Sequence, residues 1–304
     1  MLYDLTDVRN EGREEHYNPL KIVNAIFVDN NKTLRRDFAQ TFMDYYRGSS
    51  IHVDFSTREA AHAVNRWASR NTNGLITDLI QEFDPETIVA IANAIYFSDR
   101  WAWEFSRRET QEDVFHAPTG DTTAWYMRRQ GSDQSYYEDD KVQAMPLGFK
   151  NSGGMYIILP KAGSAEDLLT SMTNDYFLEI RQNMQLARGT LLLPRFSITN
   201  DIVGLKEALT LLGVPLFEGF LLTGLVEEDP VLLTDAIQRA VIEVDERGTT
   251  AAAVTIISGN GSDGGSPPNI PFEMICNKPF VFILCDYTYD GGSQVLFTGM
   301  VNQP

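Results

Sequence analysis

The first quarter of the chain carries apolar residues at the spacing of an amphipathic helix in two places. The first apolar stripe consists of Leu34, Phe38, Phe42 and Tyr45. Gly48 follows this stripe, and a glycine at that point predicts the C-terminal end of a helix. The second stripe consists of Ala60, Val64, Trp67 and Ala68. We expect Ser56 and Glu59 to form a capping box before the second helix and Gly74 to end it.

The remaining apolar runs follow the patterns of β-strands. Residues 51–55 (IHVDF) alternate in polarity, and residues 87–97 (TIVAIANAIYF) are apolar enough for a strand buried on both faces. After residue 120 strand signals dominate, in the runs 155–160, 190–198, 240–244, 278–284 and 293–301, with one more helix expected near residues 205–213. The pattern predicts an α+β fold with several extensive sheets.

Length and composition are those of a large globular protein. The chain has 304 residues, of which 43% are apolar and 22% charged, and this excludes disordered and collagen-like classes. No internal repeat or long linker divides the chain, which favours a single domain over residues 1–304. The first residues, MLYDLTDVRNEGREEHYNPLK, carry charges where a signal peptide needs an apolar centre, and no apolar window is long enough for a membrane span.

The charge balance makes polyanionic partners unfavourable. A net charge of −17 repels phosphate backbones and anionic lipid, and no cluster of Lys and Arg offsets it. We therefore expect neither a nucleic acid nor a membrane surface as partner.

The sequence offers no position for a metal or cofactor. The acidic runs Glu138–Asp140 and Glu227–Asp229 lack both calcium-loop spacing and a histidine partner, and are interpreted as solvated loops. Phosphate-binding glycine loops, CxxC pairs and HExxH motifs do not occur. Cys276 and Cys285 lie nine residues apart in what reads as one strand, which predicts two buried thiols and no disulfide.

Two fragments are similar to the neighbourhoods of a catalytic His and Ser in a protease. These are AAH at 60–62 and GSDGGSP at 261–267. His62 falls within the second predicted helix, where a histidine on the polar face is the ordinary interpretation. In the other fragment the serine and aspartate are transposed relative to the protease pattern. We interpret both as coincidences and expect no catalytic residues and no enzyme activity.

The segment from Thr249 to Ser262 is unusual for a surface region. It carries no charge, begins with threonines and alanines and ends in glycine and serine. Proteins normally avoid an uncharged stretch that can form a strand, because it invites pairing with other strands. We therefore expect this segment to have a function.

Several segments together resemble the serpins, the serine protease inhibitor superfamily. The residues that resemble the hinge of the serpin reactive-centre loop are Glu246, Arg247, Gly248, Thr249, Thr250, Ala251, Ala252 and Ala253. Further resemblances lie in order along nearly the whole chain, at residues 53–76, 93–101, 193–198, 205–214, 277–284 and 296–304.

The resemblance implies a serpin fold, with several large, mainly antiparallel β-sheets surrounded by helices. It places an exposed reactive-centre loop at residues 248–271, and Trp101 and Gln238 in the breach region where the loop enters the central sheet. Gln238 departs from the histidine of many relatives, and we expect its amide to take over the hydrogen bonding. The family's N-terminal helices and first strand have no counterpart in residues 1–304.

The implied activity is inhibition by a suicide substrate. A serine protease cleaves the loop, becomes trapped as an acyl-enzyme, and is carried along as the loop inserts into the central sheet. Side chains of the inserted strand alternate between two faces. The inward residues would be Thr249, Ala251, Ala253, Thr255 and Ile257, and the outward ones Thr250, Ala252, Val254 and Ile256; none is charged. The alternatives are a non-inhibitory serpin-like binding or chaperone protein, and an inactive truncated fragment.

The sequence of the expected reactive-centre loop predicts the specificity of the protease that cleaves it. Counting fourteen residues beyond Gly248 puts the scissile bond at Ser262–Asp263, with Ile257–Ser258 as the rival bond. Neither Lys nor Arg occurs between Thr249 and Asn277, so a trypsin-like pocket finds no cation. A protease of small-residue or aliphatic specificity is expected. The resemblance also implies a monomer that acts outside the cell and needs no cofactor.

Overall fold

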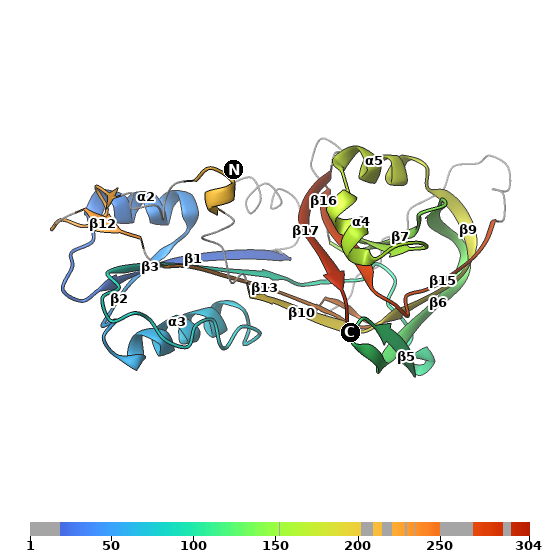
Figure 1. The fold of residues 1–304 in the computed structure, drawn as a ribbon, viewed down its shortest axis with the longest axis horizontal. Helices are drawn as coiled ribbons and strands as arrows, with labels where there is room; N and C mark the ends of the chain where they lie inside the picture. The colour runs from blue at the N-terminus through green and yellow to red at the C-terminus, as the bar shows by residue number, and fades with distance from the viewer. Residues whose placement is uncertain are drawn as a thin grey trace. The chain divides into compact units, whose positions relative to one another are not determined.

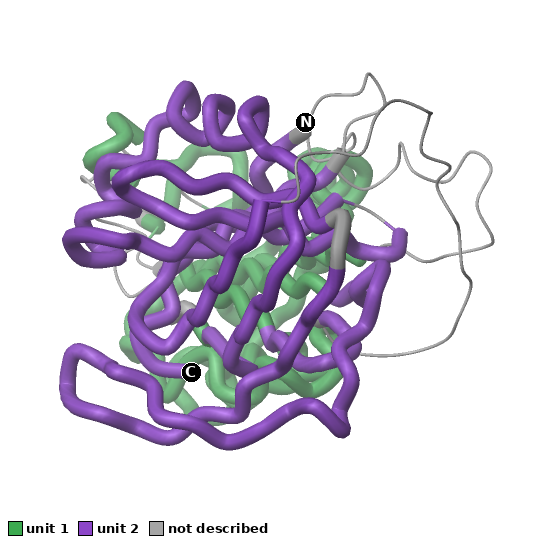
Figure 2. The backbone as a smooth tube through the Cα atoms, turned by 90° about the vertical axis from the view of Figure 1, so that its right-hand side faces the viewer, with its two compact units in different colours: residues 1–97, 199–242 green, residues 98–198, 243–304 purple. Residues whose placement is uncertain are grey.

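The computed structural model describes residues 19–151, 153–201, 209–214, 221–228, 230–233, 235–249, 270–287 and 293–304. Its contacts gather into two compact units, one formed by residues 1–97 and 199–242 and the other by residues 98–198 and 243–304 (Figure 2). The proposal of a single domain over the whole chain stays a prediction.

The first unit is built on a five-stranded sheet (Figure 1). In spatial order the strands of this sheet are β10 (Phe196–Asp201), β13 (Asp235–Val244), β3 (Val89–Phe97), β1 (Leu20–Asp29) and β2 (Ser49–Val53). Residues 196–198 of β10 and 243–244 of β13 are counted with the second unit. β3 pairs antiparallel with β1 and parallel with β13. Every side chain of β3 is at least partly buried, as the apolar run at 87–97 predicts.

Two helices pack against side chains that β1 directs to opposite faces of the sheet. Phe27 belongs to the same buried cluster as the apolar face of α3 (Arg58–Asn71). Its neighbour Ile26 belongs to a second cluster, against which Phe38 and Phe42 of α2 (Arg36–Tyr46) pack. Because adjacent residues of a strand point to opposite faces, the sheet carries a core on each face. α3 lies where its apolar stripe predicts it. α2 begins only after Leu34, which forms an isolated bridge with Val226, and Tyr45 at the end of its predicted stripe is 66% exposed.

The predicted capping box before α3 is wrong. Thr57 is the N-cap residue, and its side chain makes no capping hydrogen bond. Ser56 instead donates its hydroxyl to Asp54 Oδ1 at 2.5 Å, so this aspartate holds Ser56 in the turn before the helix. Its hydroxyl is then not available to pair with the backbone of Glu59.

The predicted glycines end both helices, by different means. Gly74 has a left-handed φ of 82° and donates to the carbonyl of Ser69 at 2.8 Å. After α2 the left-handed residue is Arg47, with φ of 48°, and not Gly48. A glycine is still required at position 48, because a Cβ there would lie 2.2 Å from the ring of Phe42.

The expected helix near 205–213 is described only at its end, where residues 209–211 are helical. The first unit also contains a short two-stranded sheet of β11 (Leu221–Leu222) and β12 (Val231–Leu232).

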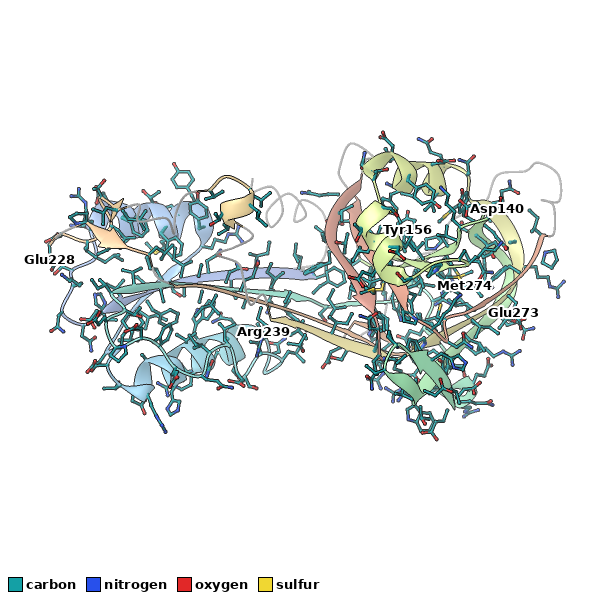
Figure 3. All side chains as sticks on the ribbon, viewed as in Figure 1. Asp140, Tyr156, Glu228, Arg239, Glu273 and Met274 are labelled. Carbon is teal, nitrogen blue, oxygen red and sulfur yellow. The ribbon has the colours of Figure 1, made fainter. Side chains whose placement is uncertain are left out.

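The second unit contains an eight-stranded sheet. Its strand order is β15 (Ile270–Ile275), β9 (Gln185–Pro194), β6 (Gly120–Glu138), β7 (Val142–Gly148), β8 (Gly154–Pro160), β16 (Phe280–Tyr287) and β17 (Ser293–Val301), and β5 (Gln111–Ala117) pairs with β6. All of these pairs are antiparallel except β15 with β9. The predicted α+β fold with large, mainly antiparallel sheets is confirmed. Along β15 exposure alternates, with Met274 buried and Glu273 exposed (Figure 3).

Helices α4 (Ala165–Ser171) and α5 (Asn174–Gln182) share a core with β8 and β16. Tyr156 of β8 meets Phe177 of α5 edge to face, with ring centroids 5.1 Å apart. A single turn of 3₁₀-helix spans Arg107–Glu109. Of the helices in the described ranges, none is long and apolar enough to cross a membrane.

Both cysteines are buried and free, as predicted, but they do not share a strand. Cys276 follows the end of β15, and Cys285 lies within β16. The chain leaves the first strand before Lys278 and Pro279, and a proline cannot donate a hydrogen bond to a sheet. Burial raises the pKa of the Cys285 thiol to about 11, which keeps it protonated and unreactive at neutral pH.

Candidate functional site

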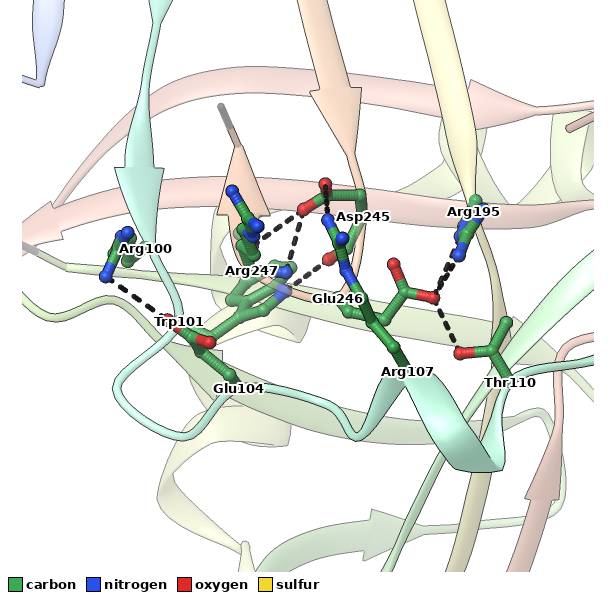
Figure 4. A network of polar contacts seen from close by, with 10 residues as sticks. Arg100, Trp101, Glu104, Arg107, Thr110, Arg195, Asp245, Glu246 and Arg247 are labelled. Carbon is green, nitrogen blue, oxygen red and sulfur yellow. Dashed lines mark hydrogen bonds and ion pairs between the residues drawn. The ribbon is translucent and has the colours of Figure 1, made fainter. Parts of the chain in front are cut away.

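The segment expected to form the hinge begins with a tight turn that follows β13. The amide of Asp245 donates to the carbonyl of Gly248 at 3.0 Å, and the amide of Gly248 donates back to the carbonyl of Asp245 at 3.3 Å. The carboxylate of Asp245 also accepts hydrogen bonds from the amides of Arg247 at 2.8 Å and Gly248 at 3.2 Å. The chain therefore reverses direction within these four residues (Figure 4).

After the turn, the chain forms a short strand. β14 (Gly248–Thr249) pairs antiparallel with β4 (Asp99–Arg100), in the register Gly248 to Arg100 and Thr249 to Asp99. Gly248 also forms an antiparallel bridge with Asp245. Gly248 is thus bonded between two strand segments, one on each side.

Only glycine fits at position 248. Its φ of 140° is one that residues with a side chain rarely adopt. A Cβ built there would also lie 2.2 Å from the carbonyl oxygen of Asp99 and 2.5 Å from Cα of Arg100. The space around this residue therefore admits no larger side chain.

Trp101 joins the strand β4 to the turn. It is 1% exposed, donates its indole N–H to the carbonyl of Asp245 at 2.9 Å, and donates its amide to the carbonyl of Arg247 at 2.9 Å. Its ring stacks on Phe149 with centroids 4.8 Å apart and meets Phe105 edge to face. The serpin pattern in the sequence puts Trp101 at the loop's point of entry, and here it bonds the turn directly.

Glu246 is a buried charge that is held by two partners. Its side chain is 2% exposed, and Oε1 accepts hydrogen bonds from Arg195 Nε at 2.9 Å and from Thr110 Oγ1 at 2.6 Å (Figure 4). Burial by itself raises the pKa of the Glu246 carboxyl, but the hydrogen bonds from Arg195 and Thr110 outweigh it, so the pKa lies below the ordinary value. Glu246, within the turn after β13, is therefore anchored as a charged group.

Gln238 takes part in a separate chain of amide hydrogen bonds, in the first unit. Gln238 Nε2 donates to Asn93 Oδ1 at 2.9 Å, Asn93 Nδ2 donates to Asn24 Oδ1 at 2.8 Å, and Asn24 Nδ2 donates to the carbonyl of Tyr46 at 2.9 Å. The first pair spans the seam between β13 and β3, where the two residues are also in register. The amide of Gln238 thus does make the hydrogen bond expected of it.

Residues 250–269 of the expected loop lie outside the described residues. This applies to Thr250, Ala251, Ala252, Ala253 and Thr255, and to both candidate scissile bonds, Ser262–Asp263 and Ile257–Ser258. Of Thr249 the backbone alone is described. These assignments stay predictions. The predicted end of the loop at residue 271 is wrong, because Ile270 and Pro271 already pair with β9 as the start of β15.

Only one of the two protease-like fragments falls within the described residues. His62 is exposed on α3 and contacts Glu59 at 3.4 Å, and fragment 261–267 lies outside the described residues. Of the acidic runs, Glu138 pairs with Lys161 at 2.7 Å. Across the described residues no group of three or more potential metal ligands occurs.

Two features of the site escaped the sequence interpretation. Arg195 lies 51 residues from Glu246, and nothing local marks it as the partner. Asn24 did carry a signal, because NAIF at 24–27 repeats NAIY at 93–96, with each asparagine inside an apolar strand. A polar residue in such a run needs a buried partner, and these two residues are in register.

The comparisons with known proteins agree on one family. The family model described as serpin, serine protease inhibitor, matches residues 2–304. An uncharacterized serpin-like protein of Thermococcus kodakarensis is 30% identical over 298 residues, which cover 94% of this chain and 66% of that protein. Alpha-1-antitrypsin of Sus scrofa is 30% identical over 289 residues, covering 92% of this chain and 66% of that protein. The chain thus spans about two thirds of the length of these relatives.

Solved structures show the same fold. The thermophilic serpin tengpin in the native state superposes with a TM-score of 0.74 at 25% identity, covering 94% of this chain and 73% of tengpin. Human thyroxine-binding globulin, solved with thyroxine, gives a TM-score of 0.78 at 22% identity, covering 94% of this chain and 75% of that chain. Serpins are generally protease inhibitors and not catalytic enzymes. With a family model matched from residue 2 to residue 304, this chain belongs to the serpin family.

Proposed function

We propose that this chain inhibits a serine protease as a suicide substrate, by inserting its cleaved loop between β3 and β13. The observation that carries the proposal is the position of Gly248, which is bridged to Arg100 on one side and to Asp245 on the other. A strand that enters there is already paired on both sides at its first residue.

The direction of this pairing suits insertion. β3 and β13 are parallel neighbours, paired from Asp235 with Ala90 to Val241 with Tyr96. A strand that follows β13 through a tight turn runs antiparallel to both, and β14 has this direction. Insertion would replace one ladder with two. The gain would be on the order of ten hydrogen bonds, each worth roughly 1 kcal/mol net.

The register also predicts the partners of the inserted residues. Thr255 lies six residues after Thr249, and Asn93 lies six before Asp99, the partner of Thr249. On the other side, Thr255 lies seven residues after Gly248 and Gln238 seven before Asp245. Without a bulge, Thr255 would therefore enter between Asn93 and Gln238. Its hydroxyl would replace the hydrogen bond that those two side chains make with each other.

The proposed target is a protease of small-residue or aliphatic specificity, because neither Lys nor Arg occurs in the proposed reactive-centre loop. We place the scissile bond at Ser262–Asp263, with Ile257–Ser258 as the rival. An extracellular location and a monomeric state are further parts of the proposal and rest on the family resemblance alone.

The test is to incubate the protein with a panel of elastase-like, subtilisin-like and trypsin-like proteases. Denaturing gels should show a covalent complex that survives SDS with the first two classes and not with trypsin. The same proteases with the catalytic serine blocked serve as the control and should give no complex. Cleavage of the loop by every protease without a complex would refute inhibition and favour a non-inhibitory binding or chaperone role.

A further inference from the structure

Residues 101–105, directly after β4, carry an exposed aromatic side chain between two buried ones. Trp103 is 74% exposed, whereas Trp101 is 1% and Phe105 5% exposed. We refer to residues 101–105 as the arch. A single exposed tryptophan is ordinary on a protein surface, so its meaning depends on how the backbone beneath it is held.

Both ends of the arch are bonded to the turn that follows β13. Trp101 donates its amide to the carbonyl of Arg247 at 2.9 Å, and Phe105 donates its amide to the carbonyl of Glu246 at 2.8 Å. These two carbonyls belong to consecutive residues, so the turn closes the base of the arch. The arch is therefore fixed to the segment that leads into the proposed reactive-centre loop.

The middle of the arch is held by Arg129 of β6. Its Nη2 donates to the carbonyl of Trp103, and its guanidinium lies over the ring of Phe105, 4.3 Å from the centroid. Burial lowers the pKa of the Arg129 guanidinium to about 10, so the group is charged at neutral pH and its hydrogen bond is charge-assisted. The backbone of Trp103 thus has little freedom to lose when the side chain is bound, and this favours binding.

Exposed positive charge lies beside the arch. Arg107 and Arg108 of the 3₁₀ turn are both exposed, and residues 100–108 contain three arginines and one glutamate in a chain of net charge −17. Tryptophan and arginine are residue types that often dominate the binding energy of protein–protein contacts. A fitting partner would offer an apolar depression with acidic groups around it.

One end of the proposed loop lies next to the arch. Thr249, the last described residue before it, pairs with Asp99, and Asp99 lies two residues before Trp101. Ile257 follows Thr249 by eight residues. The candidate bond Ile257–Ser258 is therefore within roughly 30 Å of this end, even for a fully extended chain.

The other end of the loop is also near the arch. Met274 of β15 and Arg129 of β6 both pair with Leu191 of β9, and Ile270 begins β15. Strand spacings therefore put Ile270 on the order of 15–20 Å from Arg129. The bond Ser262–Asp263 lies within roughly 25 Å of Ile270 along the chain. A protease of about 250 residues is on the order of 40 Å across, so its surface can reach the arch from either bond.

We propose that the arch is a second contact site for the target protease, outside the cleaved loop. Trp103 would enter an apolar depression on the protease, and Arg107 and Arg108 would pair with acidic groups around that depression. This inference rests on the proposed function and adds a source of specificity to it. Among proteases that cleave after small or aliphatic residues, the arch would favour those with such a depression.

The test measures binding of the target protease with its catalytic serine blocked, so that neither cleavage nor trapping occurs. Trp103→Ala should weaken the Kd of this complex at least about tenfold. The matched control is Tyr45→Ala, which removes another exposed aromatic side chain, 66% exposed on α2 of the first unit, and should leave the Kd unchanged. An unchanged Kd in Trp103→Ala, or no binding by the unchanged protein, would overturn the inference.

Charge and trapping give two further measurements. Arg108→Gln should weaken binding more at low salt than at high salt, and an effect independent of salt would remove Arg108 from the contact. With active protease, Trp103→Ala should slow trapping without changing the number of inhibitor molecules consumed per protease trapped. A rise in that number would assign Trp103 to insertion and overturn the inference.

Failure of the proposed function is distinguishable from failure of this contact. Binding of the blocked protease that depends on Trp103, without trapping of the active protease, would refute inhibition and leave the contact in place. Light scattering of the protein alone tests the competing occupant, a second copy of this chain. A dimer that forms in the unchanged protein and is lost in Trp103→Ala would assign the arch to self-association and overturn the inference.

Discussion

The carboxylate of Glu246 and the guanidinium of Arg195 form an ion pair in which the acid is 2% exposed and the base 42% exposed. Glu246 lies two residues before Gly248, where the hinge begins to pair. Thr110 Oγ1 donates to the same oxygen, Oε1, that accepts from Arg195. Glu246 is therefore held by its side chain, while the turn beside it is held by backbone bonds.

Removal of Arg195 should be more damaging than removal of the Glu246 charge. Arg195→Met leaves a buried carboxylate without its cation, and we expect a loss of about 2–3 kcal/mol in the free energy of unfolding, discounted for the partial exposure of Arg195. Glu246→Gln keeps a hydrogen-bonding side chain and should cost about 1 kcal/mol. Urea unfolding of the two variants and of the double variant measures the coupling, which should be about 1–2 kcal/mol. Strictly additive losses would show that the pair does not contribute.

The same pair predicts a pH dependence. The folded pKa of Glu246 lies below its ordinary value, so the pair stabilises the folded state above that ordinary value, and the contribution is lost as the pH falls through the folded pKa. The advantage of the unchanged protein over Glu246→Gln should therefore begin to shrink near the ordinary glutamate pKa of about 4.3 and shrink further as the pH falls below it. Urea unfolding at each pH measures it, and a difference that stays constant down to the acid end would contradict this assignment.

A methyl group at position 248 should displace the hinge. Gly248→Ala places a Cβ 2.2 Å from the carbonyl oxygen of Asp99 and also requires an unfavourable φ. Gly224→Ala is the control, since Gly224 has a φ of 87° but open space around its Cβ position. We expect Gly248→Ala to cost about 1–3 kcal/mol more than the control in urea unfolding. Equal losses would mean that the backbone angle alone matters.

The fold could be predicted from local patterns because the apolar runs are long and their periods are clear. The run at 87–97 became β3, and the stripe that contains Val64 and Trp67 became the buried face of α3. Two local predictions were wrong, because in each case a nearby residue overrode the pattern on which the prediction was based. Pro279 interrupts the apolar run that was interpreted as one strand, and Asp54 removes Ser56 from the helix cap.

The site could be predicted only as far as the family pattern extends along the chain. That pattern names Glu246, Gly248 and Trp101, which the structure brings together around one turn. Arg195 and Thr110 could not be predicted as partners of Glu246. They lie far from Glu246 in the sequence and come close to it only through the arrangement of the strands, which no local sequence pattern indicates.

The alternation of the hinge can be tested with two arginines. Thr249 should point inward during insertion and Thr250 outward, so Thr249→Arg would bury an unpaired cation at the first step and Thr250→Arg would expose one. Slow insertion lets hydrolysis of the acyl link release the protease. Thr249→Arg should therefore behave as a substrate, and Thr250→Arg should remain an inhibitor. The measurement is the number of inhibitor molecules consumed per protease trapped, and an equal rise in both variants would show that the alternation is wrong.

Thr255 tests the register of insertion. Cleavage of the loop should raise the melting temperature sharply, because insertion adds a ladder between β3 and β13. If Thr255 enters between Asn93 and Gln238, it separates side chains that now lie 2.9 Å apart and must supply a hydroxyl to both. Thr255→Val keeps the shape and removes the hydroxyl, so the cleaved form should lose about 1–3 kcal/mol and the uncleaved form nothing.

The matched control is Thr250→Val, a loss of the same hydroxyl at a position expected to face outward. Its cleaved form should melt at the same temperature as the cleaved unchanged protein. Calorimetric melting of each variant before and after cleavage gives both comparisons. If Thr250→Val lowers the melting temperature of the cleaved form as much as Thr255→Val does, the register set by Gly248 does not continue along the inserted strand. A bulge or a shift must then lie between the hinge and Asn93, because only an unbroken ladder brings residue 255 to that pair.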